Sequence, residues 1–317
     1  MILNKRRSFI TGIRSTTLSK KEKKFLNKFK PWGVILFSRN IKSIKQTKKL
    51  TDEIKDIFRD KNYPILIDQE GGRVNRLKIF FNADPLTSEY FGNLYSTNLR
   101  QFNKYYEIFI NKTSYLLKLV GININTVPVL DLKVKGSSSI IGDRAFSSIP
   151  KIVSEIGEIC INKFHLNNIA TVIKHIPGHG LAKVDSHLLT PIIKKKYSEL
   201  IKKDFSIFKN KKSILAMTAH IIYKDIDPKY TATHSKKIIH VIRKNIKYKN
   251  ILMSDDISMK SLKYTIKQNT QKAFNAGCNL VLHCNGNFNE MLIVGKYSPL
   301  LSNFLIKKTS QLYKILS

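Results

Sequence analysis

The segment from Lys174 to His187 reads KHIPGHGLAKVDSH and gathers three histidines, two lysines and an aspartate. These histidines, together with Asp185, are residue types that bind zinc, so a metal site is one interpretation. Against it, Pro177 and Gly178 stand between His175 and His179 and break any helix that would place the two rings on one face. No HExxH pattern is present. We therefore expect no metal at this segment.

Proton transfer is the second interpretation of the segment. Asp185 and His187 are two residues apart, so their side chains point the same way in an extended loop. A carboxylate bonded to one imidazole nitrogen fixes the tautomer and raises the basicity of the ring. The other nitrogen then exchanges a proton near neutral pH. Gly178 and Gly180 would let the loop bend as a lid does. A solvated, capped loop is the plain alternative.

A pair of carboxylates follows the apolar run in LMSDDISM, at Asp255 and Asp256. At the mouth of a buried strand, such a carboxylate could be a nucleophile or a base. The simpler interpretation is that one of the two caps the next helix, and taken alone this pair favours the cap.

A third cluster lies in IDQEGGRVNRL, where Asp68, Glu70, Arg73 and Arg76 surround two glycines. Arginines hold carboxylates or sugar hydroxyls with forked hydrogen bonds. The alternative is a structural network of ion pairs. Arg144, in IIGDRAFSS, lies in an expected turn and indicates little by itself.

Short apolar runs alternate with longer amphipathic stretches along the chain, and this alternation predicts a parallel sheet with helices on its faces. The expected strands are 8–13, 32–37, 64–70, 122–131, 170–176, 213–221, 250–256 and 279–285. The expected helices are 20–29, 44–58, 98–120, 153–164, 198–208, 236–246, 270–278 and 302–316.

Eight βα units in 317 residues predict an α/β fold, a single (β/α)8 TIM-type barrel that forms one domain over 1–317. No GxGxxG or Walker pattern supports a nucleotide-binding fold. Active sites of such barrels lie at the carboxyl ends of the strands. Acid, base or amide side chains end six of the expected strands, which is more than ordinary loops would supply.

The composition includes a formal net charge of +34, from 56 basic and 22 acidic residues. Nucleic-acid binding is one interpretation. Because the lysines are spread over the whole chain without a known binding module, we favour a compositional bias and expect no nucleic-acid partner. Three scattered cysteines and no apolar run near the roughly 18 residues of a membrane span favour a cytoplasmic protein without a membrane partner.

Taken in order, GVILFSRN, DQEGGRVNR, IGDRAF, KHIPGHG…DSH, AMTAHI and MSDDISM resemble the bacterial β-N-acetylglucosaminidases of glycoside hydrolase family 3. The resemblance runs from about Gly12 to about Asn285 and fits the barrel-only members that act in peptidoglycan recycling. Gln69 stands where many members have His, and Ile176 where Phe is usual.

The resemblance implies a retaining hydrolase that removes terminal β-linked GlcNAc from GlcNAc-1,6-anhydroMurNAc peptides. It makes Asp255 the nucleophile and His187 the acid/base with Asp185 as its partner. The residues matching the family's sugar-binding positions are Asp68, Arg76, Arg144, Lys174 and His175. It implies a carbohydrate substrate, no cofactor and a monomer.

Three other functions stay open at this stage. The chain could be a β-glucosidase-like member of the family, a basic nucleic-acid-binding protein on a barrel that has lost its activity, or a zinc hydrolase. A histidine acid/base also avoids repulsion of an incoming anion, so phosphate could replace water as the acceptor.

Overall fold

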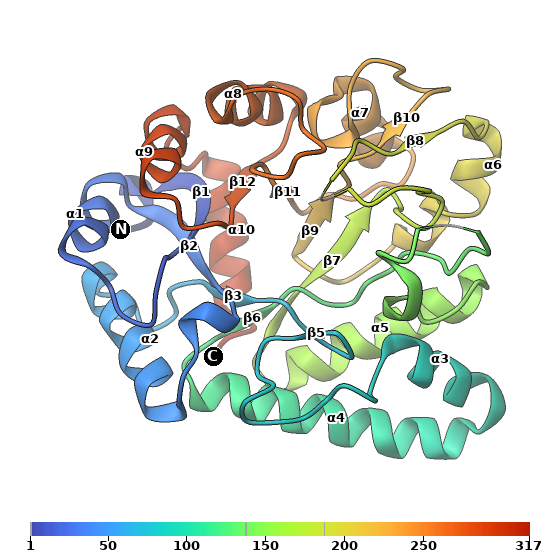
Figure 1. The fold of residues 1–317 in the computed structure, drawn as a ribbon, viewed down its shortest axis with the longest axis horizontal. Coiled ribbons are helices and arrows are strands. Elements are labelled where there is room, and N and C mark those ends of the chain that lie inside the picture. Colours follow the sequence, from blue (N-terminus) through green and yellow to red (C-terminus); the bar gives the residue numbers. More distant parts are fainter. Residues whose placement is uncertain (1, 137, 187) are drawn as a thin grey trace.

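A computed structural model describes residues 2–136, 138–186 and 188–317. His187, the expected acid/base, lies outside the described residues. Eight parallel strands close into a barrel with helices around it, so the predicted (β/α)8 fold is confirmed (Figure 1). The strands are β1 (Arg7–Gly12), β2 (Pro31–Leu36), β3 (Ile65–Ile67), β6 (Ile124–Asn125), β7 (Ala170–Ile176), β9 (Leu215–Thr218), β11 (Ile251–Asp256) and β12 (Leu280–His283).

The strands follow one another around the barrel in chain order, and β12 closes it by pairing with β1. Each pairing has a defined register, such as Phe9 beside Val281 and Val172 beside Leu215. The strands are apolar on both faces because one face fills the barrel and the other packs against helices. All eight carboxyl ends therefore meet at one end of the barrel.

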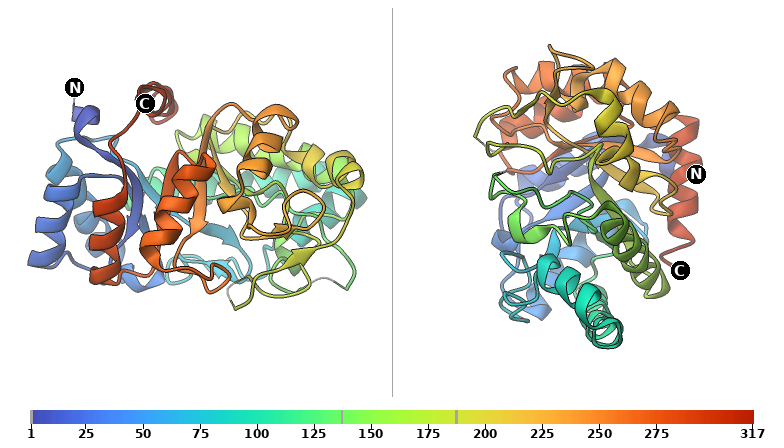
Figure 2. Two further views of the ribbon diagram at one scale, coloured as in Figure 1. Left: turned by 90° about the horizontal axis from the view of Figure 1, so that it is seen from above. Right: turned by 90° about the vertical axis from the view of Figure 1, so that its right-hand side faces the viewer.

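Helices cover the outside of the barrel (Figures 1 and 2). They are α1 (Lys20–Phe29), α2 (Ile44–Phe58), α3 (Ser88–Thr97), α4 (Leu99–Leu119), α5 (Pro150–Leu166), α6 (Tyr197–Lys202), α7 (Lys236–Lys244), α8 (Ile266–Ala276), α9 (Phe288–Tyr297) and α10 (Asn303–Tyr313). Short 3-10 turns are η1 (Ile2–Lys5), η2 (Ser38–Asn40), η3 (Gly142–Arg144), η4 (Phe205–Phe208) and η5 (Ala232–His234). Within the described parts of the chain, no helix is long and apolar enough to cross a membrane.

Four expected strands are clearly shorter than predicted: those expected over 213–221 and 279–285 are regular only in β9 and β12, and the other two differ more. The strand expected over 64–70 ends at Ile67, and β4 (Gln69–Gly71) instead pairs antiparallel with β5 (Val74–Asn75). Gly71 and Gly72 both have positive φ, which turns the chain back on itself. The strand expected over 122–131 is regular only in β6, because Pro128 has no N–H to donate.

Several elements were missed from the sequence. Helices α3 and α9 lie outside the predicted ranges, and β8 (Ile192–Ile193) pairs with β10 (Ile222–Tyr223) in a small sheet of two strands. The segment expected as one helix over 198–208 divides into α6 and η4. These elements are short or bury few side chains, so their periodicity is weak.

Helix α10 closes the end of the barrel opposite the carboxyl ends of the strands; it lies behind β1 and β12 in Figure 1. Leu301, Leu305 and Leu312 join the side chains inside the barrel. The Trp32 indole N–H donates to Thr309 Oγ1 over 2.8 Å within this buried layer. The helix thus seals the apolar interior from water at this end.

Truncating Leu305 tests this seal. Because Leu305 is buried against the barrel interior, Leu305→Ala should lower the free energy of unfolding by about 2–4 kcal/mol, measured by urea denaturation. Lys307→Ala, at an exposed position of the same helix, should change it by less than about 0.5 kcal/mol. Equal effects of the two changes would contradict the packing described here.

Candidate active site

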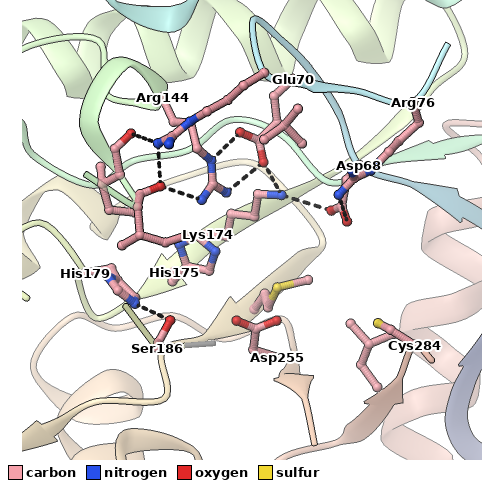
Figure 3. Close-up of a pocket in the computed structure, with 16 residues that line it drawn as sticks. Asp68, Glu70, Arg76, Arg144, Lys174, His175, His179, Ser186, Asp255 and Cys284 are labelled. Atoms are coloured by element: carbon pink, nitrogen blue, oxygen red, sulfur yellow. Dashed lines mark hydrogen bonds and ion pairs between the residues drawn. The ribbon is translucent and has the colours of Figure 1, made fainter. Parts of the chain in front are cut away.

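A cavity of about 230 Å³ opens at the carboxyl ends of the barrel strands (Figure 3). This is below the roughly 300–1,000 Å³ of pockets for drug-sized ligands and suits a single sugar ring. The described residues that line it include three carboxylates and four cations, with Met217 and Leu282 at the barrel end. The charged residues are Asp68, Glu70, Asp255, Arg73, Arg76, Arg144 and Lys174.

Lys174 carries a buried ammonium group at the centre of this charge cluster, only 2% exposed near the end of β7. Its Nζ lies 3.0 Å from Asp68 Oδ1, 2.6 Å from Glu70 Oε1 and 2.9 Å from Thr126 Oγ1. Burial alone would lower the pKa of Lys174, but Asp68 and Glu70 outweigh it and raise the pKa. Lys174 is therefore charged at neutral pH and is held in place by three oxygens.

Glu70 joins Lys174 to Arg144 (Figure 3). The Arg144 guanidinium donates from Nε and Nη2 to the two Glu70 oxygens, over 2.7 and 2.9 Å. Burial would raise the pKa of Glu70, but Arg144 and then Lys174 lower it strongly. Burial of Arg144 would lower its pKa, but the Glu70 carboxylate outweighs this and raises the pKa of Arg144. Glu70 is thus ionised at neutral pH and links two cations.

Asp68 faces the cavity just after β3 and accepts hydrogen bonds from Lys174 and from the Thr126 hydroxyl. Burial would raise its pKa, but Lys174 and Arg76 lower it overall. Arg76 approaches less closely, with 3.8 Å between its Nη2 and Asp68 Oδ2. Arg73 does not pair with Asp68. It forms an ion pair with Asp143 over 3.0 Å and donates to the Ile140 carbonyl in the loop before η3.

His175 lies next to Lys174 and is held by Asp131, a buried residue that follows β6. The His175 Nδ1–H donates to Asp131 Oδ2 over 2.7 Å, and the His179 backbone N–H donates to Asp131 Oδ1 over 2.6 Å. Burial would raise the pKa of Asp131, but His175 outweighs it. One carboxylate therefore fixes both a cavity side chain and the start of the following loop.

His179 is buried, and its Nε2 lies 3.0 Å from Ser186 Oγ. Burial, together with the neighbouring His175, lowers the pKa of His179 to about 4, so its ring is neutral at pH 7. The flanking glycines are required by packing: Gly178 has a φ of 144°, and a Cβ on Gly180 would lie 2.2 Å from the Leu132 carbonyl oxygen. His179 thus lies buried within the loop, between two glycines and in contact with Ser186.

The two carboxylates at the end of β11 have different environments. Asp256 Oδ1 accepts hydrogen bonds from the backbone N–H groups of Ser258 and Cys284, over 3.0 and 3.1 Å. The N-cap of the next helix, α8, is Thr265, so neither aspartate caps it. Asp255 lines the cavity, and its carboxylate points toward Lys174 and His175 across the open space (Figure 3).

Asp185 lies in the loop that follows β7, half-buried, and its backbone carbonyl accepts from the N–H groups of Leu188 and Leu189. Its expected partner, His187, is outside the described residues. Ser186, between them in the chain, lines the cavity. The loop thus reaches the cavity at the residue between the two expected partners.

All five predicted sugar-binding residues, together with Asp255, line this one cavity. Three further contributors were missing from the predicted site: Thr126, Asp131 and Cys284. Asp131 is the last residue of the strand expected over 122–131, so the sequence carried a signal for it: a carboxylate at a strand end. Thr126 carried none, because its role depends on the distance between β6 and β7. Among the described residues, no group of three or more His, Cys, Asp or Glu side chains forms a metal-binding cluster.

The Glycosyl hydrolase family 3 N terminal domain model matches residues 9–303. The chain belongs to this family. It is therefore a glycoside hydrolase, as its motifs predicted. The glycosidase is similar to the β-hexosaminidase of Nitrosomonas eutropha, with 33% identity over 86% of this chain and 79% of that protein. It is also similar to the β-hexosaminidase of Hydrogenovibrio crunogenus, with 34% identity over 87% of this chain and 78% of that protein.

Solved structures agree with this assignment. The glycosidase superposes on NagZ from Neisseria gonorrhoeae, solved in complex with N-trifluoroacetyl-D-glucosamine, with a TM-score of 0.84 and 27% identity. The match covers 98% of this chain and 90% of the other. It also superposes on a family 3 β-N-acetylglucosaminidase from Paenibacillus with a TM-score of 0.86, at 23% identity, which shows the shared fold.

Replacing Glu70 tests the buried charge network. Glu70→Gln leaves two buried cations short of a negative charge and should lower the free energy of unfolding at pH 7 by about 3–5 kcal/mol. The folded pKa of Glu70 is lowered, so its stabilisation is present above the unfolded value near 4.3 and fades as pH falls below it. Urea denaturation of both proteins should show their difference shrinking between about pH 5 and pH 3.

Glu199→Gln is the matched control, because Glu199 forms an exposed pair with Lys195. It should cost less than about 1 kcal/mol at any pH. A difference between Glu70→Gln and the original protein that stays constant down to pH 3 would contradict the lowered pKa.

Proposed function

We propose that the protein is a retaining β-N-acetylhexosaminidase that removes terminal β-linked GlcNAc. The observation that carries the proposal is the position of Asp255. Its carboxylate lines a sugar-sized cavity with charged walls while its Oδ1 accepts from the Asp256 backbone N–H, whereas Asp256 is not among the described residues that line the cavity and accepts from the Ser258 and Cys284 backbone. The names of the relatives and the N-trifluoroacetyl-D-glucosamine bound to a structural neighbour favour an N-acetylhexosamine over glucose.

In the proposed first step, Asp255 attacks the anomeric carbon while His187 gives a proton to the departing glycosidic oxygen. The C–O bond to the leaving group breaks as the bond to the Asp255 oxygen forms, through an oxocarbenium-like transition state. Asp185 would orient the His187 ring. In the second step, His187 takes a proton from water, which displaces Asp255 and restores the β configuration.

The sugar would be held by Asp68, Arg76, Arg144, Lys174 and His175. Asp68 accepts hydrogen bonds from sugar hydroxyls, whereas Lys174 and the arginines donate. Lys174 and Arg144 are already fixed by Glu70, so they need no reorganisation when charge develops on the ring. Asp131 holds His175 in one orientation, which supports its assignment to binding.

The assignment of His187 is supported by the state of the other histidines of the segment. His179 has a pKa near 4 and contacts Ser186, so it does not suit proton exchange at neutral pH. His175 has its Nδ1 engaged by Asp131 beside the sugar-binding Lys174. Of the three histidines in the segment, His187 remains, two residues from Asp185 in the chain.

The family resemblance suggests that the substrates are peptidoglycan fragments, GlcNAc-1,6-anhydroMurNAc peptides, handled in the cytoplasm by a monomer whose residues 1–317 form one domain. The volume of this cavity, about 230 Å³, suits one sugar ring and supports removal of one sugar at a time from a chain end.

Asp255→Asn tests the nucleophile. It should lower kcat for 4-nitrophenyl β-N-acetylglucosaminide by at least about a thousandfold, because an amide cannot form the glycosyl-enzyme. Asp256→Asn is the matched control, since an asparagine still offers an oxygen to Ser258 and Cys284, and it should cost less than about tenfold. Equal losses would contradict the roles of the two carboxylates. Faster cleavage of the matching glucoside would favour a β-glucosidase.

His187→Ala tests the acid. Loss of a general acid should slow release of a poor leaving group, such as an alkyl alcohol, by about a hundred- to ten-thousandfold. The rate of glycosyl-enzyme formation with a dinitrophenyl glycoside, whose leaving group needs no proton, should fall much less. Burst kinetics measure this step separately from hydrolysis. A uniform loss for both leaving groups would remove His187 from the acid role.

A further inference from the structure

The proposed nucleophile lies where the regular pairing of β11 is interrupted. The last pair that β11 forms with β9 is Met253 beside Met217, and its pairing with β12 changes register between Met253 and Asp256. An irregularity of this kind bends a strand and re-aims its side chains. It also removes backbone partners that a regular ladder would supply. Asp255 lies within this irregular stretch, so the backbone that carries it needs other partners.

Side-chain atoms supply these partners on both sides of β11. Toward β12, Ser254 Oγ accepts from the Leu282 backbone N–H over 2.9 Å, and Asp256 Oδ1 accepts from the Cys284 backbone N–H over 3.1 Å. Toward β9, the Asp256 carbonyl accepts from His220 Nε2 over 2.9 Å. His220 follows the last residue of β9 by two positions. It therefore replaces the backbone donor that β9 no longer offers.

Asp256 connects His220 to the proposed nucleophile. The Asp256 backbone N–H donates to Asp255 Oδ1 over 2.7 Å, while the Asp256 carbonyl accepts from His220. Both groups belong to one residue, and a residue has only two soft backbone dihedrals. Holding the carbonyl thus restricts the direction of the N–H, and the N–H in turn holds one oxygen of the Asp255 carboxylate.

The proton of the His220 ring is fixed as well. Burial lowers the pKa of His220 despite the nearby Asp255 carboxylate, so the ring is neutral at pH 7. A carbonyl only accepts, so the proton lies on Nε2 and Nδ1 accepts from the Thr233 hydroxyl over 2.7 Å. Thr233 Oγ1 lies 2.8 Å from the Thr218 hydroxyl, which can donate to it. This chain of hydrogen bonds selects the tautomer that donates to Asp256.

His220 cannot act on the sugar directly. His220, Thr218 and Thr233 are all fully buried, and none of them is among the described residues that line the active-site cavity. A histidine of the core with both nitrogens satisfied is the simpler interpretation. Against it, the single N–H of the ring is spent on the residue that holds the Asp255 carboxylate.

We infer that His220 is a positioning residue that fixes the direction of the Asp255 carboxylate through the backbone of Asp256. The inference rests on the proposed function, in which Asp255 is the nucleophile. Attack requires a carboxylate oxygen about 3–3.5 Å from the anomeric carbon and in line with the breaking bond. The proposed sugar-binding residues come from other parts of the chain, so loss of this alignment should lower the rate without weakening sugar binding.

The first test removes the donor from His220. His220→Ala should lower kcat for 4-nitrophenyl β-N-acetylglucosaminide by about a hundredfold and change KM by less than about threefold. His220→Gln should restore kcat to within about tenfold of the original protein, because its amide N–H can replace the Nε2–H. His240→Ala, at an exposed position of α7, is the matched control and should leave both constants unchanged.

The second test loosens the tautomer without touching the histidine. Thr233→Val keeps the shape of the side chain but removes the hydroxyl that donates to Nδ1, so kcat should fall by about three- to tenfold with little change in KM. Thr113→Val is the matched control: Thr113 is equally buried, on α4, and its hydroxyl has no hydrogen-bond partner among the described residues. It should leave kcat unchanged. This pair decides the question even where His220→Ala does not fold.

In each variant kcat is counted per folded enzyme, with the folded fraction taken from urea denaturation. A rise in KM alone, or a loss of activity no larger than the loss of folded protein, would mean that His220 only supports the fold, which overturns the inference. Unchanged kcat in His220→Ala and Thr233→Val, with Asp255→Asn inactive, would also overturn it and leave the proposed function intact. No turnover by the original protein, or full turnover by Asp255→Asn, would instead refute the proposed function and the inference with it.

Discussion

The active site depends on one constraint: the ammonium group of Lys174 is buried at the mouth of the barrel and must be compensated. Glu70 and Asp68 supply the compensation, from β4 and from the end of β3. Each carboxylate then needs more than one cation, and Arg144 and Arg76 approach from the far sides. The result is an alternating chain of charges whose members fix one another. Replacing a member leaves a neighbouring charge with fewer opposite charges around it, and where that charge is buried this costs more than the pair contributes.

Asp131 has a comparable effect on the other side of the cavity. It binds the His175 ring and the His179 backbone, so the course of the chain after β7 is set by one carboxylate. Close packing of Gly180 on the Leu132 backbone adds to this. Lys174 and His175, two of the proposed binding groups, are therefore held near the end of β7, while Asp185 and Ser186 lie further along the loop. A glycosidase needs this division, because the sugar must be held rigidly while the leaving group has to depart.

The barrel was predictable because its strands are apolar on both faces and alternate with amphipathic helices, and β7 was predicted with its observed bounds. Elements whose stability comes from tertiary contacts were not: α3 buries little beyond Phe91, and β4 is turned by two glycines. In the site, Asp68 and Lys174 were predictable from motifs. Thr126 was not, because its role is a distance between two strands, and local sequence does not encode such a distance.

The charges that could attract an anionic molecule lie mainly on the surface, whereas the charges beside Asp255 lie inside the cavity. Inside the cavity, the cations are almost matched by carboxylates, so the +34 net charge resides mainly on exposed lysines. Their field is screened within about 8–10 Å at moderate salt, which allows it to attract anionic molecules without reaching Asp255.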